Sequence, residues 1–479
     1  MPQDLFLPLG VQAETGELLP TIESDTLADF SSLPVEAHLA DLPKSMAENW
    51  QDAPPFGTDC DVRDMNNLAE TGWAILFSNE TSDNVKRMLQ PLIELRQRQV
   101  GNDALFKIFD GGESFQKGDT AETWLSRRSA DGIPMADVDP AKGVPFYLLI
   151  VGSPEEIPFE FQYGLDLFWA VGRLWFPTAA EYGQYAEAVV RYENAGTRVE
   201  TARQMAIFAP RNGQDKAMEL LTENLAVPMT RPSNTKPPFG EKQNFRLRKY
   251  FGEAATVESL DQIWRGKIPH GRPALVFTGS HGMVFYSGDR RQANQQGAIV
   301  CNEWPGVGAP KSKQYFAADD VAKDARLDGM IHFLFNCYGA GSPRKDNFAG
   351  LSQRPSLVAE QPFLGRLPQV LLKQGALAVL GHVDRAWSSS YRSALGPRIE
   401  GFRGVVSQLL MGDRIGYATD RLNRQWSTLS IDIVQAVEAR LEGDELKSKW
   451  IARNNARNYI VVGDPAVRLR VADMGVLAD

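Results

Sequence analysis

The stretch that decides the fold reads Ile-His-Phe-Leu-Phe-Asn-Cys-Tyr-Gly-Ala-Gly over residues 331–341. Its first five residues are apolar apart from one histidine, which is typical of a parallel strand buried on both faces. The polar Asn336 and the glycines that follow then end the strand. Cys337 is therefore expected just beyond the carboxyl end of a strand, where the loops of an open α/β sheet form their sites.

A second run of the same kind lies earlier in the chain. Residues 274–278 read Ala-Leu-Val-Phe-Thr, and Gly-Ser-His-Gly follows them, with the histidine at His281. The carboxyl ends of neighbouring parallel strands meet at one edge of a sheet. The sequence therefore predicts that His281 and Cys337 share that edge.

Predicted strands and helices also alternate along the chain before and after these two strands. Further strands are expected at 73–77, 146–151, 205–208, 376–380 and 459–462, with amphipathic helices between and after them. The alternation predicts an α/β fold whose parallel-rich sheets are flanked by helices. We expect an N-terminal extension over 1–65, a first α/β subdomain over 66–200 and a second over 201–479 that carries the chemistry.

The composition is that of a globular protein with an acidic balance. Of 479 residues, 43% are hydrophobic and 23% are charged, so the chain can bury sizeable cores. Lys and Arg number 51 and Asp and Glu number 60, so the net charge is 51 − 60 = −9. This balance argues against nucleic acid and anionic membranes as partners. No apolar run approaches the roughly 20 residues that cross a bilayer and no leader pattern opens the sequence, so a cytoplasmic location is expected.

Cysteine is scarce in this chain. Cys60, Cys301 and Cys337 are too few and too scattered for a disulfide framework or a four-thiolate zinc site. No spacing of histidines and carboxylates resembles a metal site, and no glycine-rich loop matches a phosphate cradle. We expect no metal and no cofactor, a packing role for Cys301 and no role for Cys60. A free reactive thiol at Cys337 remains.

Cys337 and His281 are the candidate catalytic pair. A cysteine is a strong nucleophile as the thiolate, and an imidazole can take its proton and later protonate the leaving amine. The unhindered N–H of Gly282 and the N–H of Cys337 are the candidate donors to the oxyanion of a tetrahedral intermediate. The alternative is that both residues are only structural: Cys337 a small buried side chain and His281 a hydrogen-bonded loop histidine. It has to explain two glycine-flanked reactive residues at two strand ends, 337 − 281 = 56 residues apart with the histidine first.

This order of motifs resembles the bacterial CHAT-domain and gingipain-type cysteine peptidases, which are relatives of caspases and clostripain. Caspases also place the histidine roughly 50 residues before the cysteine. The segment from Gly381 to Trp387 and the terminal Val-Gly-Asp-Pro-Ala of residues 462–466 agree with the resemblance. It is strongest over 270–470, weaker over 70–200 and absent before that. It implies two tandem caspase-like α/β subdomains, of which the first is non-catalytic.

Two features depart from the family pattern. Residues 283–318 form a long insertion between His281 and Cys337, and the caspase pentapeptide around the cysteine is missing. The missing pentapeptide argues against a preference for aspartate. The insertion and the N-terminal extension are candidates for control by a regulatory partner or signal.

The loop after the next predicted strand holds the candidates for substrate specificity. Asp384 would favour Lys or Arg before the scissile bond, Arg385 would favour acidic residues, and Trp387 would line an apolar pocket. Alternatively, the two charged residues have no role in specificity and are simply exposed to solvent or paired with each other. His382 also follows this strand and competes with His281 for the catalytic role, although the motif order favours His281.

Two further histidines receive structural roles. His270 lies between prolines and is expected in a turn, and His332 falls within a strand, where a buried and hydrogen-bonded side chain is expected. The resulting interpretation is a cysteine endopeptidase that hydrolyses peptide bonds in protein or peptide substrates. Two alternatives stay open: a catalytically silent caspase-like scaffold that binds a peptide or partner, and a transpeptidase that passes the acyl group to an amine.

Overall fold

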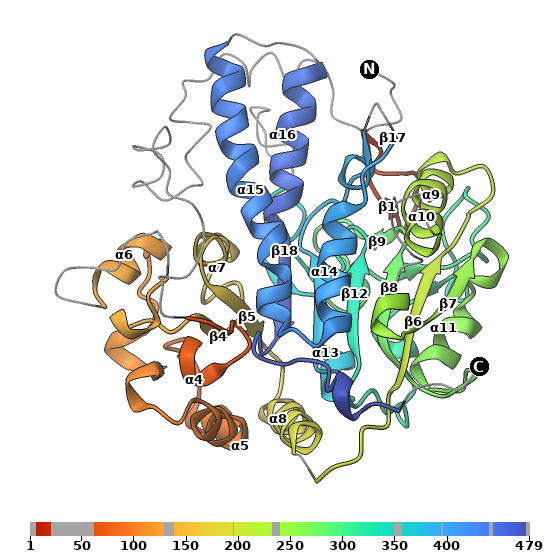
Figure 1. Cartoon of the computed structure of the whole chain (residues 1–479). Coiled ribbons are helices and arrows are strands. Elements are labelled where there is room, and N and C mark those ends of the chain that lie inside the picture. Colours follow the sequence, from red (N-terminus) through yellow and green to blue (C-terminus); the bar gives the residue numbers. More distant parts are fainter. Residues whose placement is uncertain are drawn as a thin grey trace.

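A ten-stranded sheet runs through both halves of the chain in this computed structural model (Figure 1). The structure describes residues 6–20, 62–128, 138–194, 196–231, 240–348, 357–393, 396–439 and 444–475, so Cys60 and most of the predicted extension lie outside the described residues. Across the sheet the strands are β3 (Phe106–Phe109), β2 (Trp73–Phe77), β4 (Tyr147–Val151), β5 (Ala170–Leu174), β18 (Tyr459–Gly463), β15 (Ala378–His382), β12 (Ile331–Phe335), β8 (Pro273–Gly279), β6 (Ala202–Ala209) and β7 (Arg246–Phe251).

The sheet consists of two parallel blocks that point in opposite directions. All neighbours pair in parallel except β15 and β18, which pair antiparallel from Ala378 opposite Gly463 to His382 opposite Tyr459. The last strand, β18, therefore joins the block of the first half by pairing in parallel with β5. The carboxyl ends of β8, β12 and β15 consequently lie at one edge, as the sequence predicted for the first two strands.

The predicted fold class, a parallel-rich α/β sheet flanked by helices, is confirmed. The strand expected at 376–380 begins two residues later, because Ala376 and Leu377 still belong to the turn after a helix. β7 was not predicted. It is an edge strand whose residues Arg-Leu-Arg-Lys-Tyr-Phe are exposed or only partly buried, so it lacks the apolar run of the central strands.

Helices cover both faces of the sheet, and β12 illustrates how. Alternate side chains of a strand point to opposite faces. Phe333 of β12 stacks on Phe402 of α14 (Glu400–Met411), with ring centroids 5.8 Å apart. The next side chain back, His332, meets Trp264 of α11 (Val257–Trp264) on the other face.

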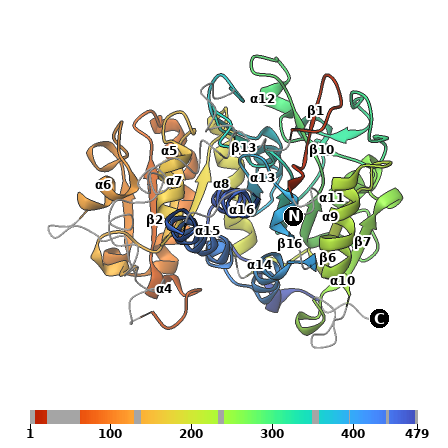
Figure 2. The ribbon, with the colours of Figure 1, turned by 90° about the horizontal axis from the view of Figure 1, so that it is seen from above.

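Two groups of packed helices run over the sheet. The long helix α15 (Ile415–Glu438) packs on α14 and on α16 (Asp444–Arg457), and these C-terminal helices cross the region between the two halves (Figures 1 and 2). In the other group, α8 (Ala179–Glu193) packs on α5 (Asp83–Val100) and α13 (Arg366–Lys373). Within the described part of the chain, no helix combines the length and apolar character that a membrane span requires.

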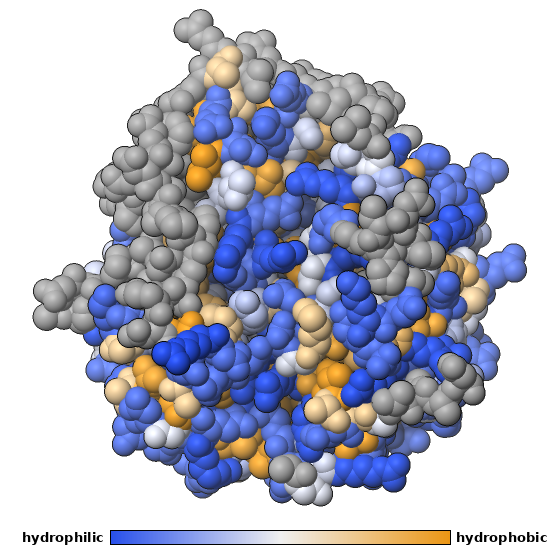
Figure 3. Space-filling view, in the orientation of Figure 1, coloured by the Kyte–Doolittle hydropathy of each residue, from blue (hydrophilic) through white to orange (hydrophobic). Residues whose placement is uncertain are grey.

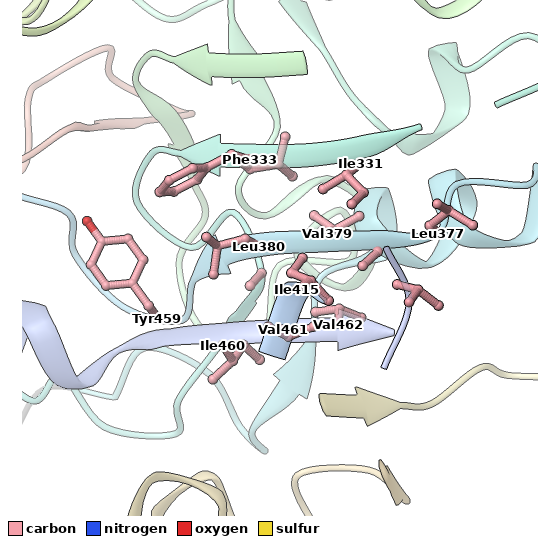
Figure 4. Packing of buried hydrophobic residues seen from close by; sticks show 14 of the residues in the cluster. Ile331, Phe333, Leu377, Val379, Leu380, Ile415, Tyr459, Ile460, Val461 and Val462 are labelled. Carbon is pink, nitrogen blue, oxygen red and sulfur yellow. The ribbon is translucent and has the colours of Figure 1, made fainter. Parts of the chain in front are cut away.

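The apolar core is continuous across the three strands at the junction. Ile331, Val379 and Val462 are buried side chains from β12, β15 and β18 that lie close together, and Ile415 at the start of α15 covers them (Figure 4). The outer surface contrasts with this core. The face drawn in Figure 3 is mostly hydrophilic, with its apolar residues in small separate groups.

A buried ion cluster fastens β18 to the first half. Arg96 of α5 is fully buried and donates to Asp464 at 2.7 Å and to Glu193 at 2.6 and 2.8 Å. Asp464 also accepts the indole N–H of Trp73 at 3.0 Å. Burial by itself raises the pKa of Glu193, but the charge and hydrogen bonds of Arg96 outweigh it and hold that pKa below its usual value. Asp464 belongs to the Val-Gly-Asp-Pro-Ala segment that carried part of the family resemblance.

The insertion at 283–318 is a structured part of the molecule. It extends a second, four-stranded sheet with the order β1 (Gly10–Gln12), β9 (Gly282–Val284), β10 (Ile299–Val300) and β11 (Tyr315–Phe316). β1 comes from the N-terminal extension and pairs with β9 in parallel, from Gly10 opposite Gly282 to Gln12 opposite Val284. The extension and the insertion therefore meet directly beside the site edge of the large sheet.

We expect the Arg96→Leu substitution to destabilise the fold by about 3–5 kcal/mol, because it leaves two buried carboxylates without their cation. Lys86→Leu on the same helix removes only a partly exposed pair with Asp110 and should cost less than about 1 kcal/mol. The free energy of urea unfolding measures both variants. Equal losses in the two variants would contradict a structural role for the cluster.

Candidate active site

The site edge is set by the pairing of β8 with β12. The two strands are parallel, and their register ends with Gly279 opposite Phe335. His281 and Cys337 each lie two residues beyond these partners. Both residues therefore lie at the carboxyl-terminal edge of the sheet, at the same distance along the chain from the last paired residues. The N–H of Ser280 donates to the carbonyl of Phe335 at 3.2 Å and continues the ladder past the strand end.

The two N–H groups predicted as oxyanion donors converge on one oxygen atom. Gly282 and Cys337 both donate to the carbonyl oxygen of Leu9, each at 3.0 Å. A side chain at residue 282 would disrupt this arrangement, because a Cβ on Gly282 would lie 2.0 Å from the carbonyl oxygen of Cys337. The glycine therefore permits the close approach of the two backbones.

The imidazole of His281 is held by a carboxylate that the sequence reasoning missed. Its Nε2 lies 2.6 Å from Oδ2 of Asp215, and both side chains are buried. The other oxygen of Asp215 caps α9 (Lys216–Leu221) by accepting from the N–H groups of Ala217 and Met218 at 2.8 and 3.3 Å. Burial by itself raises the pKa of Asp215, but the His281 imidazole and these hydrogen bonds outweigh it and bring that pKa below its usual value.

The second ring nitrogen of His281, Nδ1, is buried and has no hydrogen-bond partner among the described residues. The ring is also positioned by Trp304, which packs edge-on at a centroid distance of 6.0 Å. Trp304 comes from the insertion. The ring therefore has one nitrogen at Asp215 and one without a partner among the described residues.

The Cys337 thiol is fully buried. Its sulfur accepts from the N–H of Ala386 at 3.2 Å, and a Cβ on Gly10 would lie 3.1 Å from it. Burial is the main cause that raises the pKa of Cys337 well above the usual value of a thiol, and the hydrogen bond from Ala386 only partly offsets it. The thiol is therefore protonated while Gly10 covers it.

His382 is committed to the main chain. Its Nδ1 lies 2.9 Å from the carbonyl oxygen of Asp384, and its Nε2 lies 2.9 Å from that of Asn455. Burial lowers the pKa of His382 to about 4, although both carbonyls act in the opposite direction. Because one ring nitrogen contacts the loop after β15 and the other contacts α16, the His382 side chain connects these two elements.

The remaining histidines and cysteines lie in structural positions. His270 is in a turn at φ 65°, as predicted, with its Nε2 2.5 Å from Nη1 of Arg246. His332 is buried as predicted, but its expected hydrogen bond is wrong, because neither ring nitrogen has a partner among the described residues. Cys301 is fully buried, and burial raises its pKa well above the usual value.

The three predicted specificity residues are buried and engaged within the chain. The carboxylate of Asp384 accepts from the backbone N–H groups of Arg385 at 2.7 Å and Asn347 at 3.2 Å. Arg385 forms a salt bridge with Asp346 and donates to a backbone carbonyl at residue 20. Trp387 packs against Phe348, with ring centroids 5.1 Å apart.

The chain belongs to peptidase family C25, since the model described as Peptidase family C25 matches residues 81–470. It is thus a cysteine peptidase of the caspase-like clan. No curated protein matches the chain. A solved structure described as "Structure of Protease" is 11% identical with a TM-score of 0.49, over 86% of this chain and 80% of that chain. Two structures of the Saccharomyces cerevisiae separase–securin complex are 12% identical, with TM-scores of 0.31 and 0.33, over 67% of this chain and 16% and 15% of those chains.

The buried His332 predicts a pH dependence of stability. Burial lowers its pKa to about 3 from the usual 6.5, so the unfolded chain takes up a proton at this residue below pH 6.5 while the folded chain does not. Stability is therefore lost as the pH falls from 6.5 toward 3. Between pH 5.5 and pH 4.5, where the unfolded imidazole is almost fully protonated, the wild type should lose up to about 1.4 kcal/mol per pH unit more than His332→Leu. Urea unfolding at several pH values measures this, and identical slopes would show that His332 takes up a proton in the folded chain.

Proposed function

We propose that the chain is a cysteine endopeptidase in which Cys337 attacks the peptide carbonyl and His281 transfers the proton. The observation that carries this proposal is the convergence of the Gly282 and Cys337 N–H groups on one carbonyl oxygen, at 3.0 Å each. Two backbone donors at this distance from a single oxygen are the arrangement that stabilises a developing oxyanion.

The reaction uses these groups in sequence. Cys337 gives its proton to His281, its sulfur bonds to the carbonyl carbon, and the electron pair of the C=O double bond moves to the oxygen held by the two N–H groups. When the C=O bond re-forms, the C–N bond breaks and His281 protonates the leaving amine. Water then attacks the thioester carbon and gives one proton to His281. The C–S bond breaks with its electron pair on sulfur, the hydroxyl group stays on the acyl carbon, and His281 returns the proton to the Cys337 thiolate.

Asp215 acts in this scheme as a positioning residue. Its contact with Nε2 leaves Nδ1 as the nitrogen that exchanges the proton with the thiol. The carboxylate also stabilises the imidazolium that forms when the thiol ionises. The two backbone contacts of the His382 ring support the choice of His281 over His382.

The first half of the chain is proposed to brace the sheet. Residues 66–200 contain neither a histidine nor a cysteine, which supports a non-catalytic role. The N-terminal extension is proposed to control the site, because its residue Gly10 lies against the buried thiol. Activity then requires a partner or signal that displaces this segment. The cytoplasmic location and the protein or peptide nature of the substrate stay predictions.

Cys337→Ala should abolish cleavage of denatured casein while the melting temperature stays within a few degrees, because the change opens only a small cavity. Cys301→Ala alters a second cysteine that is buried in the described part of the chain, and it should keep the activity of its parent. Both variants are made in a chain that carries Leu9→Arg, since a charged side chain is costly at the fully buried Leu9 site and should vacate the cleft. If Cys337→Ala cleaves casein at the rate of the parent, Cys337 is not the nucleophile.

Asp215→Asn in the same parent should lower kcat on the order of 10²- to 10⁴-fold with little change in KM, because the amide no longer holds the imidazole in its working form. Asparagine caps a helix as well as aspartate does, so the fold should be retained, and any fall in melting temperature should reflect only the weaker contact with His281. Asp139→Asn is the matched control, because Asp139 caps a helix in the first half of the chain. A kcat within threefold of the parent would remove Asp215 from the mechanism.

A further inference from the structure

An N-terminal segment of the protein itself lies along the site edge in an extended conformation. The backbone of Leu7 exchanges hydrogen bonds with Ser388, from Leu7 N–H to the serine hydroxyl at 3.0 Å and from Ser388 N–H to the Leu7 carbonyl at 2.9 Å. Pro8 forms an antiparallel bridge with Trp387, and the N–H of Leu9 donates to the carbonyl of Ala386 at 2.8 Å. The segment therefore adds a short strand to the loop after β15, which is how extended peptides are commonly bound.

The peptide bond between Leu9 and Gly10 lies at the catalytic groups. The Leu9 carbonyl oxygen occupies the pair of N–H donors, and Gly10 lies against the sulfur of Cys337. A carbonyl held by the oxyanion donors beside the nucleophile occupies the position of a scissile bond. Leu9 therefore stands where the residue before the cut would stand, and Gly10 where the residue after it would stand.

The chain beyond this bond is also fixed. β1 pairs in parallel with β9, and the N–H of Leu19 donates to the carbonyl of Gly10 at 3.0 Å, which folds the segment back on itself. Gly10 is required for this fit, because a Cβ there would lie 2.6 Å from a methyl carbon of Leu19 and 3.1 Å from the Cys337 sulfur. The segment thus holds the site from both sides of the bond.

We propose that the cleft binds an extended peptide with a leucine-sized apolar side chain immediately before the scissile bond, and that residues 6–12 occupy it in the manner of such a substrate. This inference rests on the proposed function for the position of the cut. It differs from the basic specificity that Asp384 suggested in the sequence.

The surroundings of Leu9 support an apolar side chain. Leu9 is 0% exposed and belongs to the main apolar cluster, together with Cys337, Tyr338 and Ala386. The nearby charges are already compensated: Arg385 pairs with Asp346, and two backbone N–H groups bind the Asp384 carboxylate. Burial and the neighbouring Asp346 raise the pKa of Asp384 to about 7, so this carboxyl is a poor partner for a cation. Burying a lysine or arginine in place of Leu9 would be costly, because among the described residues Arg385 and Asp346 already pair with each other.

A second apolar site lies three residues before Leu9. Phe6 is buried in a separate cluster whose members are Phe348, Trp387, Ile433, Ala436, Leu446, Trp450 and Ile451. Trp387 therefore belongs to the apolar site for the residue three positions before Leu9. The predicted role of Trp387 in lining an apolar pocket applies to this position of the cleft. Phe-Leu-Pro-Leu-Gly-Val-Gln, the sequence of residues 6–12, is the natural template for a test substrate.

The test uses the full chain with Leu9→Arg, which should vacate the cleft, and peptides of this template that carry Leu, Met, Arg, Lys or Asp before glycine. We expect cleavage on the carboxyl side of leucine, with kcat/KM at least about tenfold higher for Leu than for Arg, Lys or Asp. Leu18→Arg is the matched control, because Leu18 lies in the same segment and is 40% exposed. Like the wild type, it should cleave the Leu peptide far more slowly than Leu9→Arg does. Equal or faster cleavage of the Arg or Lys peptide, or cleavage of the Leu9→Arg chain after residue 9, overturns the inference.

A binding measurement separates this inference from the proposed function. Fluorescence anisotropy follows the labelled Leu and Arg peptides on a chain that carries both Leu9→Arg and Cys337→Ala. Tighter binding of the Leu peptide by at least about tenfold supports the apolar site even if no peptide is ever cut, and then only the proposed function fails. Cleavage that depends on Cys337, with equal binding and turnover of all the peptides, supports the peptidase and overturns the apolar site.

Discussion

The site depends on the parallel register between β8 and β12. Each residue along a strand advances the chain by about 3.3 Å and turns the side chain to the other face. A slip by one residue would therefore separate His281 from Cys337 and break the pair of N–H donors. The register is fixed by burial on both faces, where Phe277 of β8 meets Phe333 of β12 edge-on at a centroid distance of 5.1 Å. The packing of the core thus positions the groups proposed for catalysis.

The same backbone groups that fit catalysis also bind the N-terminal segment of the chain. The N–H groups of Gly282 and Cys337 need a carbonyl oxygen, and Leu9 supplies it. The Cys337 thiol beside this segment is fully buried, and its burial raises the pKa of Cys337 well above the usual value. A substrate that replaces the segment would inherit its hydrogen bonds. In the proposed mechanism, the segment and a substrate therefore compete for the same two N–H donors.

The two halves of the sheet are joined by buried polar contacts as well as by apolar packing. The antiparallel pair of β15 with β18 brings the end of the chain between the two parallel blocks, where Arg96 holds Asp464 and Glu193. Such a cluster is stable only when every charge has a partner, and here each does. Tyr185 of α8 adds to the junction by accepting from the N–H of Asp464 at 2.7 Å and donating to the carbonyl of Leu377 at 2.9 Å. The first half thereby stabilises the strand next to β15, whose loop borders the site.

The sequence by itself determined the central strands, the α/β class and the positions of His281, Gly282 and Cys337 at two strand ends, because buried strands leave apolar runs that end in glycine. Only the tertiary structure decided which carboxylate holds His281, since Asp215 lies 66 residues away and looks in the sequence like any helix cap. It also decided that Leu9, from an extension without periodicity, fills the site. Both contacts join segments distant in the chain through single polar atoms. Such contacts leave no repeating pattern of side chains, and only the folded backbone brings their partners together.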